Sequence, residues 1–346
     1  MGVHAAVTET GKPDRVLLAH GSGGSLSHEL VARRVLPCTA TSAAPVLDDS
    51  AVVRLEGRLA FTTDSYIVQP LFFPGGDIGR LAVCGTVNDL SMVGAEPRHL
   101  SLALILEEGF PLEHLDVVMR SIATACGEAG VSIVTGDTKV VNRGKGDGLF
   151  INTAGIGMVP DGRSISGSRA QPGDRILISG PLAEHGLAIM AAREGLAFSS
   201  EIRSDCAPLN GIVAALLEAV GDAVHCMRDP TRGGLGTTLN ELALQSLVAM
   251  LVDEPTIPVR PDVRAACEML GLDPMYVANE GKFVAVVEPS SAAAALQALR
   301  SHPLGREATD IGEVVAGKPG RVMMRTQLGP TRLVAMLSGE LLPRIC

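Results

Sequence analysis

Five aspartates of this 346-residue chain stand at or near the ends of apolar segments, beside small or hydroxyl residues: Asp49, Asp64, Asp89, Asp137 and Asp229. A carboxylate in such a place is costly unless it is hydrogen-bonded or bound to a metal. Proteins bind Mg²⁺ with a few carboxylates together with the phosphates of a nucleotide. The five aspartates therefore predict a nucleotide site, although each one taken alone is more often a helix cap or a turn residue.

The segment Asp229–Leu242, DPTRGGLGTTLNEL, places an acid and a hydroxyl ahead of two glycines that open a helix. Free N–H groups at a helix N-terminus bind anions, and the arginine adds a forked donor for phosphate; the alternative is an ordinary cap with a glycine turn. The residues assigned to this contact are Asp229, Thr231, Arg232, Gly233 and Gly234. A second glycine loop at His20–Gly24 matches neither the P-loop nor the dinucleotide pattern.

Three further residues are candidates for the chemistry itself. Lys139 in GDTKVV and Glu280 in ANEGKF lie beside apolar strands, where either is a candidate general base or phosphate contact, although most such residues are simply solvated. Cys346 ends the chain, so it is either an inert end or a nucleophile or carrier sulfur. The eight histidines show no metal-ligand spacing, and no transition metal is predicted.

Composition limits the class of partner. The net charge of −9 argues against nucleic acid, and seven Phe, two Tyr and no Trp leave few stacking platforms for bases. No apolar run approaches the length of a membrane helix, and the N-terminus lacks a signal pattern, so we expect a cytoplasmic protein without a membrane partner. The seven cysteines lie far apart without a CxxC pair, which argues against a disulfide framework and a zinc site.

Apolar runs and helical patterns alternate along the whole chain, which predicts a mixed α/β (α+β) fold. Because 160–174 is turn-forming, we predict an N-terminal domain at 1–160, a C-terminal α/β domain at 174–337 and a flexible tail at 338–346. The tail spans at most about 30 Å, enough to carry its terminal cysteine into a distant site. The expected elements include a hairpin of 51–55 with 59–64, helices at 77–94, 111–130 and 209–220, a helix from 233, and strands at 98–106, 131–136 and 149–159.

Seven segments that run in order over nearly the whole chain resemble the HypE family of hydrogenase maturation proteins. They are HGSGG (20–24), FTTDSYIV (61–68), VCGTVNDLSMVGAEP (83–97), GDTKVV (136–141), DPTRGGL (229–235), LGLDPMYVANEGK (270–282) and the ending PRIC (343–346). One glycine loop alone means little, whereas this ordered set with a terminal cysteine is highly specific.

The resemblance implies the fold shared by aminoimidazole ribonucleotide synthetase, selenophosphate synthetase and thiamine-monophosphate kinase, in which the N-terminal domain pairs in a homodimer beside an ATP cleft. It also implies a reaction. HypF would carbamoylate Cys346, this protein would dehydrate the S-carboxamide to an S-cyanide with ATP, and the cyanide would pass to iron on the HypC–HypD complex for [NiFe] hydrogenase. Asp49, Asp64, Asp89 and Asp137 would hold Mg²⁺ and phosphates, with Lys139 and Glu280 as candidate bases.

Two alternatives remain at this point. A small-molecule synthetase or kinase of the same superfamily would share the aspartates but would not need Cys346. Selenophosphate synthetase typically carries its reactive residue near the N-terminus, whereas the first cysteine here is Cys38. A non-catalytic carrier of the terminal thiol would need neither ATP hydrolysis nor five placed carboxylates.

Overall fold

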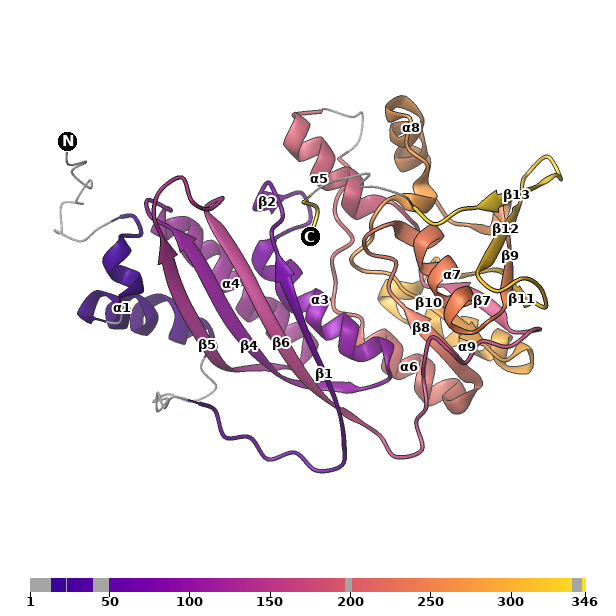
Figure 1. The fold of residues 1–346 in the computed structure, drawn as a ribbon, viewed down its shortest axis with the longest axis horizontal. Helices are drawn as coiled ribbons and strands as arrows, with labels where there is room; N and C mark the ends of the chain where they lie inside the picture. The colour runs from indigo at the N-terminus through magenta and orange to yellow at the C-terminus, as the bar shows by residue number, and fades with distance from the viewer. Residues whose placement is uncertain (1–13, 23, 40–49, 197–200, 338–343) are drawn as a thin grey trace.

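The computed structural model describes residues 14–22, 24–39, 50–196, 201–337 and 344–346 (Figure 1). In this part of the chain, a four-stranded and a seven-stranded sheet carry most of the architecture. The C-terminal residues lie between the two sheets, far from the short N-terminal helices α1 (Ser25–Leu30) and α2 (Leu36–Thr39) (Figure 1). The expected mixed α/β architecture is therefore present.

The first sheet has the order β1-β6-β4-β5 and is antiparallel except for the pair β4 and β5. Its strands are β1 (Arg58–Tyr66), β4 (Glu96–Glu107), β5 (Ser132–Val141) and β6 (Leu149–Val159). A parallel pair requires a crossover, and helix α4 (Leu112–Ala129) supplies it. With α3 (Ile78–Met92), α4 covers one face of the sheet, and no described helix covers the other (Figure 1).

The predicted limits of the two covering helices are confirmed to within about two residues. Asp77 caps α3 because its Oδ1 accepts the N–H groups of Gly79 at 2.8 Å and Arg80 at 3.0 Å. Gly130 ends α4 in the left-handed region at φ 68°, which glycine adopts without strain. The small hairpin of β2 (Phe72–Phe73) and β3 (Gly76–Asp77) leads directly into α3.

The expected hairpin of 51–55 with 59–64 is wrong. Residues 51–56 form no strand, and Val52 is 97% exposed. Strand β1 instead pairs along its full length with β6, from Arg58 opposite Val159 to Tyr66 opposite Ile151. The segment 51–55 is apolar, but it finds no buried face to pack against, so its β-propensity is not realised.

The second sheet has the order β13-β12-β9-β11-β7-β10-β8, and only β12 and β9 are parallel. Its strands are β7 (Arg175–Ile178), β8 (Val224–Arg228), β9 (Ala249–Asp253), β10 (Val284–Val287), β11 (Thr309–Val315), β12 (Arg321–Arg325) and β13 (Thr331–Val334). Its helices are α5 (Glu184–Glu194), α6 (Asn210–Val220), α7 (Gly234–Gln245), α8 (Pro261–Leu270) and α9 (Ala292–Ser301).

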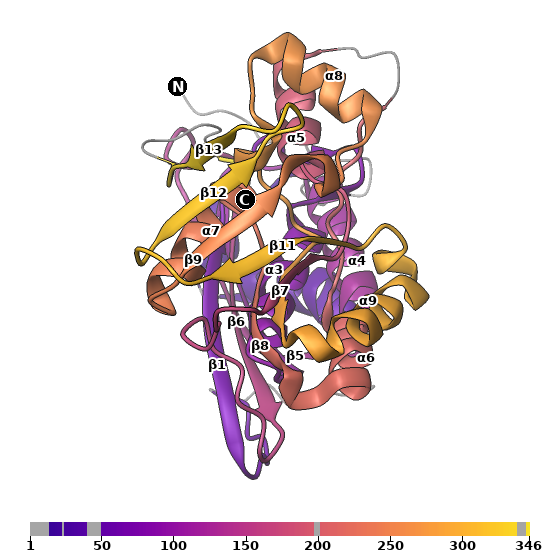
Figure 2. The same ribbon diagram turned by 90° about the vertical axis from the view of Figure 1, so that its right-hand side faces the viewer.

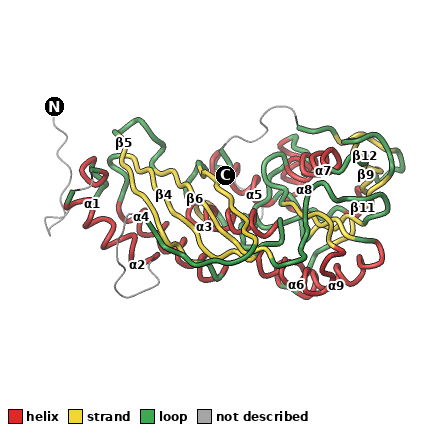
Figure 3. The backbone as a smooth tube through the Cα atoms, turned by 60° about the horizontal axis from the view of Figure 1, so that its bottom comes forward, coloured by secondary structure: helices red, strands yellow, loops and turns green. Residues whose placement is uncertain are grey.

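Both faces of the second sheet are buried. Ile176 and Ile178 pack into one core with α7 and α8, whereas Leu177 packs into a second core with α6 and α9. Figures 2 and 3 show these two pairs of helices on opposite sides of the sheet. The two sheets are separated by 160–174, and we propose the same division for the domains. No described helix is long and apolar enough to cross a membrane.

Candidate functional site

The last three residues are docked against the segment that follows β1. The backbone N–H of Ile67 donates to the carbonyl of Cys346 at 3.3 Å, and the N–H of Gln69 donates to the carbonyl of Arg344 at 3.1 Å. Ile345 is 4% exposed and belongs to the core under the first sheet. The chain end thus runs antiparallel to residues 67–69, the segment after β1, which places the terminal thiol between the two sheets.

The thiol of Cys346 is half-buried among charged groups from distant parts of the sequence. Burial raises its pKa to about 12, and the carboxyls of Glu280 and Asp64 act in the same direction, whereas Arg232 acts against them. These three side chains come from the loop before β10, from β1 and from the loop before α7. The structure therefore brings four predicted site residues together, and it holds the docked thiol in its protonated form at neutral pH.

Glu280 is 3% exposed and lies in the loop that precedes β10. Burial raises its pKa well above the ordinary value, and the negative charges of Asp229 and Asp205 add to the shift. The loop is fixed at its backbone, because the N–H groups of Glu280 and Gly281 both donate to Asp205 at 3.1 Å. A fixed, buried carboxyl with a raised pKa beside a thiol has the properties of a general base.

Three of the five predicted aspartates, Asp64, Asp89 and Asp229, lie close enough for their negative charges to interact. Burial raises the pKa of Asp229 to about 7, with Asp89 as the next cause and Asp64 as a smaller one. Burial also raises the pKa of Asp89, which lies on α3 and accepts the hydroxyl of Thr62 at 2.8 Å. Among the described residues, no three His, Cys, Asp or Glu side chains converge closely enough to hold a metal by themselves. A cation here would need further ligands, such as phosphate oxygens.

Asp137 and Lys139 lie on the opposite face of the first sheet. The Lys139 Nζ is 2.5 Å from the Asp137 Oδ1, both side chains are exposed, and Lys139 is the main cause of a lowered pKa at Asp137. They lie opposite Ala103 and Ile105 of β4, on the uncovered face, whereas Asp64 and Tyr66 of β1 point toward α3. Within one chain, Asp137 and Lys139 are therefore not brought to Cys346, and Asp49 lies outside the described residues.

The glycines of the 229–235 segment open α7 as expected. Gly233 and Gly234 have φ of 80° and 60°. A Cβ on Gly234 would lie 2.7 Å from the carbonyl oxygen of Met275, so a larger residue would force this loop away from its neighbour. Gly234 N–H donates to the carbonyl of Thr231 at 2.9 Å, and Arg232 is exposed at the mouth of the loop. The loop offers backbone and guanidinium donors to an anion.

Three positioning residues were missed by sequence reasoning. Asn88 on α3 donates to the carbonyl of Glu280 at 3.2 Å and accepts the N–H of Leu209 at 2.8 Å. Asn279 accepts the N–H of Ala183 at 2.8 Å and donates to the carbonyl of Pro230, which ties the 229–235 segment to the Glu280 loop. The third is Asp205, which accepts the backbone N–H groups of Glu280 and Gly281. Both asparagines lie next to predicted site residues, and that adjacency was the only available signal.

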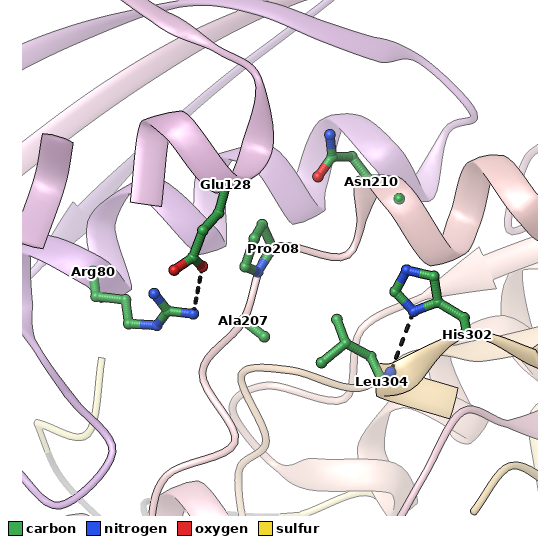
Figure 4. Close-up of a pocket in the computed structure, with 8 residues that line it drawn as sticks. Arg80, Glu128, Ala207, Pro208, Asn210, His302 and Leu304 are labelled. Atoms are coloured by element: carbon green, nitrogen blue, oxygen red, sulfur yellow. Dashed lines mark hydrogen bonds and ion pairs between the residues drawn. The ribbon is translucent and has the colours of Figure 1, made fainter. Parts of the chain in front are cut away.

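A separate pocket of about 250 Å³ lies between α3, α4 and the start of α6 (Figure 4). Its charged groups pair with each other, since the Arg80 Nη2 lies 2.8 Å from the Glu128 Oε2, and His302 accepts the N–H of Leu304 at 3.2 Å. None of the predicted site residues lines it. We therefore place the site at the docked tail and not in this pocket.

Comparison with known proteins connects this arrangement to a family. The family models for AIR synthase related proteins match the chain at 47–159 (N-terminal domain) and 171–325 (C-terminal domain). The carbamoyl dehydratase HypE of Azotobacter vinelandii is 54% identical over 332 residues, which are 96% of this chain and 97% of that protein. A crystal structure of HypE in complex with ATP is 51% identical with a TM-score of 0.92, over 95% of this chain and 99% of that one. The HypE–HypF complex matches with 46% identity and a TM-score of 0.79, over 91% of this chain and 100% of that chain.

Proposed function

The chain belongs to the HypE family of carbamoyl dehydratases, and we propose from this premise that it uses ATP to convert an S-carboxamide on its own Cys346 into an S-cyanide. The cyanide would serve as a ligand in [NiFe] hydrogenase maturation. One observation assigns this reaction to a particular site in the structure. The terminal thiol is docked between the two sheets, beside the buried carboxyl of Glu280 and near Arg232 and Asp64.

The reaction needs two changes at the carboxamide. Its oxygen is a poor leaving group, so the γ-phosphoryl of ATP is transferred to it, which gives an imidate phosphate and ADP. Elimination of phosphate then breaks the C–O bond and forms the nitrile, so the thiocarbamate and ATP become the thiocyanate, ADP and phosphate. The nitrogen loses two protons, and Glu280 is placed to accept one because its raised pKa makes its carboxylate a stronger base.

Asp64, Asp89 and Asp229 are the described residues that fit a Mg²⁺–ATP complex. A bound cation would relieve their mutual repulsion, with phosphate oxygens as its further ligands. Thr231, Arg232 and the backbone of Gly233 and Gly234 would contact phosphate. The bound ion would neutralise charge on the transferring phosphoryl group. Asp49, which lies outside the described residues, remains a proposed ligand of the same Mg²⁺.

Mg²⁺ binding in the presence of ADP is expected to weaken on acidification below about pH 7. The carboxyl of Asp229, whose pKa is about 7, is protonated there, and a metal ligand must be deprotonated. One displaced proton corresponds to about a tenfold loss of affinity per pH unit. Calorimetric titration in two buffers of different ionisation enthalpy measures this proton release. Asp229→Asn should abolish the pH dependence, and equal Mg²⁺ affinity at pH 6 and pH 8 would contradict the assignment.

We also propose a homodimer that pairs through the uncovered face of the first sheet. This face carries large apolar side chains, with Phe61 69% exposed, Leu59 51% and Ile105 40%. Exposed large apolar side chains that share one face of a sheet are typical of a protein–protein contact surface. Asp137 and Lys139 share the face, so in a dimer they would point toward the partner and not toward their own Cys346. Lys139 then contributes to the reaction only across the interface.

Phe61→Asp is expected to convert the dimer into a monomer, because it places a charge in the centre of the proposed apolar interface. Light scattering after size-exclusion chromatography measures the change in mass. Leu328→Asp, at an apolar side chain that is 92% exposed outside the first sheet, is the control and should leave the mass unchanged. A wild-type chain that is monomeric at micromolar concentration would refute the proposed interface.

Two partners and a location complete the proposal. HypF is the proposed carbamoyl donor, supported by the relative that is seen in a HypE–HypF complex. The HypC–HypD complex is the proposed acceptor of the cyanide. We place the reaction in the cytoplasm, which is consistent with seven free cysteines.

The mass of the C-terminal peptide tests the function. The protein is first incubated with HypF, carbamoyl phosphate and ATP. In a parallel sample, a non-hydrolysable ATP analogue replaces ATP during the dehydration that follows carbamoylation. We expect a carbamoyl increment on Cys346 that loses one water only with hydrolysable ATP. A carbamoyl group that never loses water would identify a carrier, and an unmodified Cys346 beside active HypF would favour a small-molecule synthetase or kinase.

A further inference from the structure

Two side chains of α5 hold the docked tail by its main chain. The Nε2 of His185 is 2.7 Å from the carbonyl oxygen of Ile345, and the Nη2 of Arg193 is 2.7 Å from the carbonyl oxygen of Arg344. The Nε of Arg193 also donates to the carbonyl of Gln69 at 2.9 Å, so this arginine bridges the tail to the segment after β1. The tail is thereby clamped between the two parts of the molecule.

The hydrogen-bond partners of His185 define its tautomer. A carbonyl oxygen only accepts, so Nε2 carries the proton that it donates to Ile345. The other nitrogen, Nδ1, then accepts the hydroxyl proton of Ser204 at 2.8 Å, and the Ser204 oxygen accepts the N–H of Cys206 at 3.1 Å. The ring is fully buried and packs edge-on against Phe73 at 5.7 Å. When the tail leaves, the buried Nε2 proton loses its acceptor, whereas the contacts of Nδ1 and Ser204 remain.

The other tail contacts are weaker. The Arg344 guanidinium meets Asp147 at 2.6 Å, but these side chains are 32% and 46% exposed, and such surface pairs contribute little. Of the two backbone hydrogen bonds, the one from Ile67 is long at 3.3 Å, and the one from Gln69 at 3.1 Å is longer than the α5 contacts. The α5 contacts are therefore the strongest polar restraints on the described part of the tail.

The two half-reactions make opposite demands on the tail. In the docked position Cys346 is half-buried beside Glu280, which restricts the access of a separate enzyme to its thiol. Loading therefore requires a released tail, whereas dehydration requires the docked position beside Glu280. We propose that His185 and Arg193 form a latch, two positioning residues that set the balance between the docked and the released tail. This inference rests on the proposed function for its two half-reactions.

The latch is tested with His185→Leu and Arg193→Gln, and with His185→Gln as a conservative variant whose amide N–H can replace the lost donor. Arg33→Gln is the matched control, because Arg33 is an exposed arginine that pairs with Glu29. His185→Leu removes one hydrogen bond to the tail, and Arg193→Gln removes the bond to Arg344 together with the bond to Gln69. Each variant is expected to raise the ratio of released to docked tail about tenfold. The half-buried Arg193 site is expected to tolerate its substitution even if the buried His185 site does not.

Two readouts should move in opposite directions. Alkylation of Cys346 by iodoacetamide, followed by the mass of the C-terminal peptide, is expected to become about tenfold faster in the latch variants. ATP-dependent dehydration of the pre-carbamoylated tail follows the docked fraction and should become slower, by a smaller factor than the gain in alkylation because the docked tail predominates, with ATP affinity unchanged and His185→Gln near wild type. A folding defect would instead lower dehydration together with ATP affinity.

The outcomes separate the latch from the function. Alkylation and dehydration rates in Arg193→Gln that equal those of wild type would overturn the latch. Faster alkylation in a protein whose wild type never dehydrates the carboxamide would support the latch as a docking device and refute the proposed function.

Discussion

Glu280→Gln is expected to lower ATP-dependent dehydration of the carbamoylated tail by about 10²- to 10⁴-fold, the range for loss of a positioned general base. The substitution keeps the size of the side chain and removes only its ability to accept a proton. The backbone of the loop stays in place, because the N–H groups that bind Asp205 belong to the main chain. Single-turnover mass spectrometry on the pre-carbamoylated protein measures the rate without any contribution from loading.

The pH profile of the same reaction gives an independent readout. Burial, Asp229 and Asp205 hold the pKa of Glu280 well above its ordinary value, so the carboxyl is protonated at low pH and cannot act as a base. The wild-type rate should therefore rise with pH through this raised pKa, whereas the Glu280→Gln rate should not follow that titration. Glu288→Gln, an exposed glutamate at the end of β10, is the matched control. A Glu280→Gln rate within twofold of wild type would assign the base to another group.

Much of the framework was predictable because it follows from local rules. Asp77 and Gly130 mark the limits of α3 and α4 by capping, which depends on only a few neighbouring residues. The glycine turn that opens α7 was predictable for the same reason, since Gly233 and Gly234 adopt positive φ there. The hairpin at 51–55 failed because strand pairing is decided by distant residues, and β6 is separated from β1 by about ninety positions.

The assembly of the site was less accessible from sequence. Asp64 and Asp137 both lie on strands beside small residues, yet they occupy opposite faces of one sheet, and only the register of β1, β6, β4 and β5 determines this. The docking of the tail depends on main-chain carbonyls at Arg344 and Ile345, which leave no signature in residue type. Asp205 lies in a loop without apolar periodicity, where an aspartate is usually solvated.

Asp205→Asn is expected to destabilise the protein by about 3 to 5 kcal/mol, the usual cost of removing one partner from a buried ion pair. Its side chain is 1% exposed and lies 3.3 Å from the Lys282 Nζ. Without it, that ammonium retains only Glu184 at 3.5 Å, and an asparagine cannot accept both loop N–H groups. Urea unfolding at pH 7 measures the loss. Dehydration should fall as well, because the Glu280 loop loses its anchor.

The sign of the pH dependence distinguishes this ion pair from a packing effect. Burial alone would raise the pKa of Asp205, but Lys282, His185 and the two backbone N–H groups outweigh it and hold the pKa below its ordinary value. The carboxylate therefore stabilises the fold above its unfolded pKa of about 3.9, and the contribution is lost as the pH falls through the lower folded value. The difference between wild type and Asp205→Asn should shrink toward acid, whereas a packing defect would persist. The control is Asp253→Asn, which breaks the more exposed ion pair with Arg325 at 2.9 Å and should lower the free energy of unfolding by less than about 1 kcal/mol at pH 7. An equal loss of stability in both variants would contradict the role of the buried pair as the anchor.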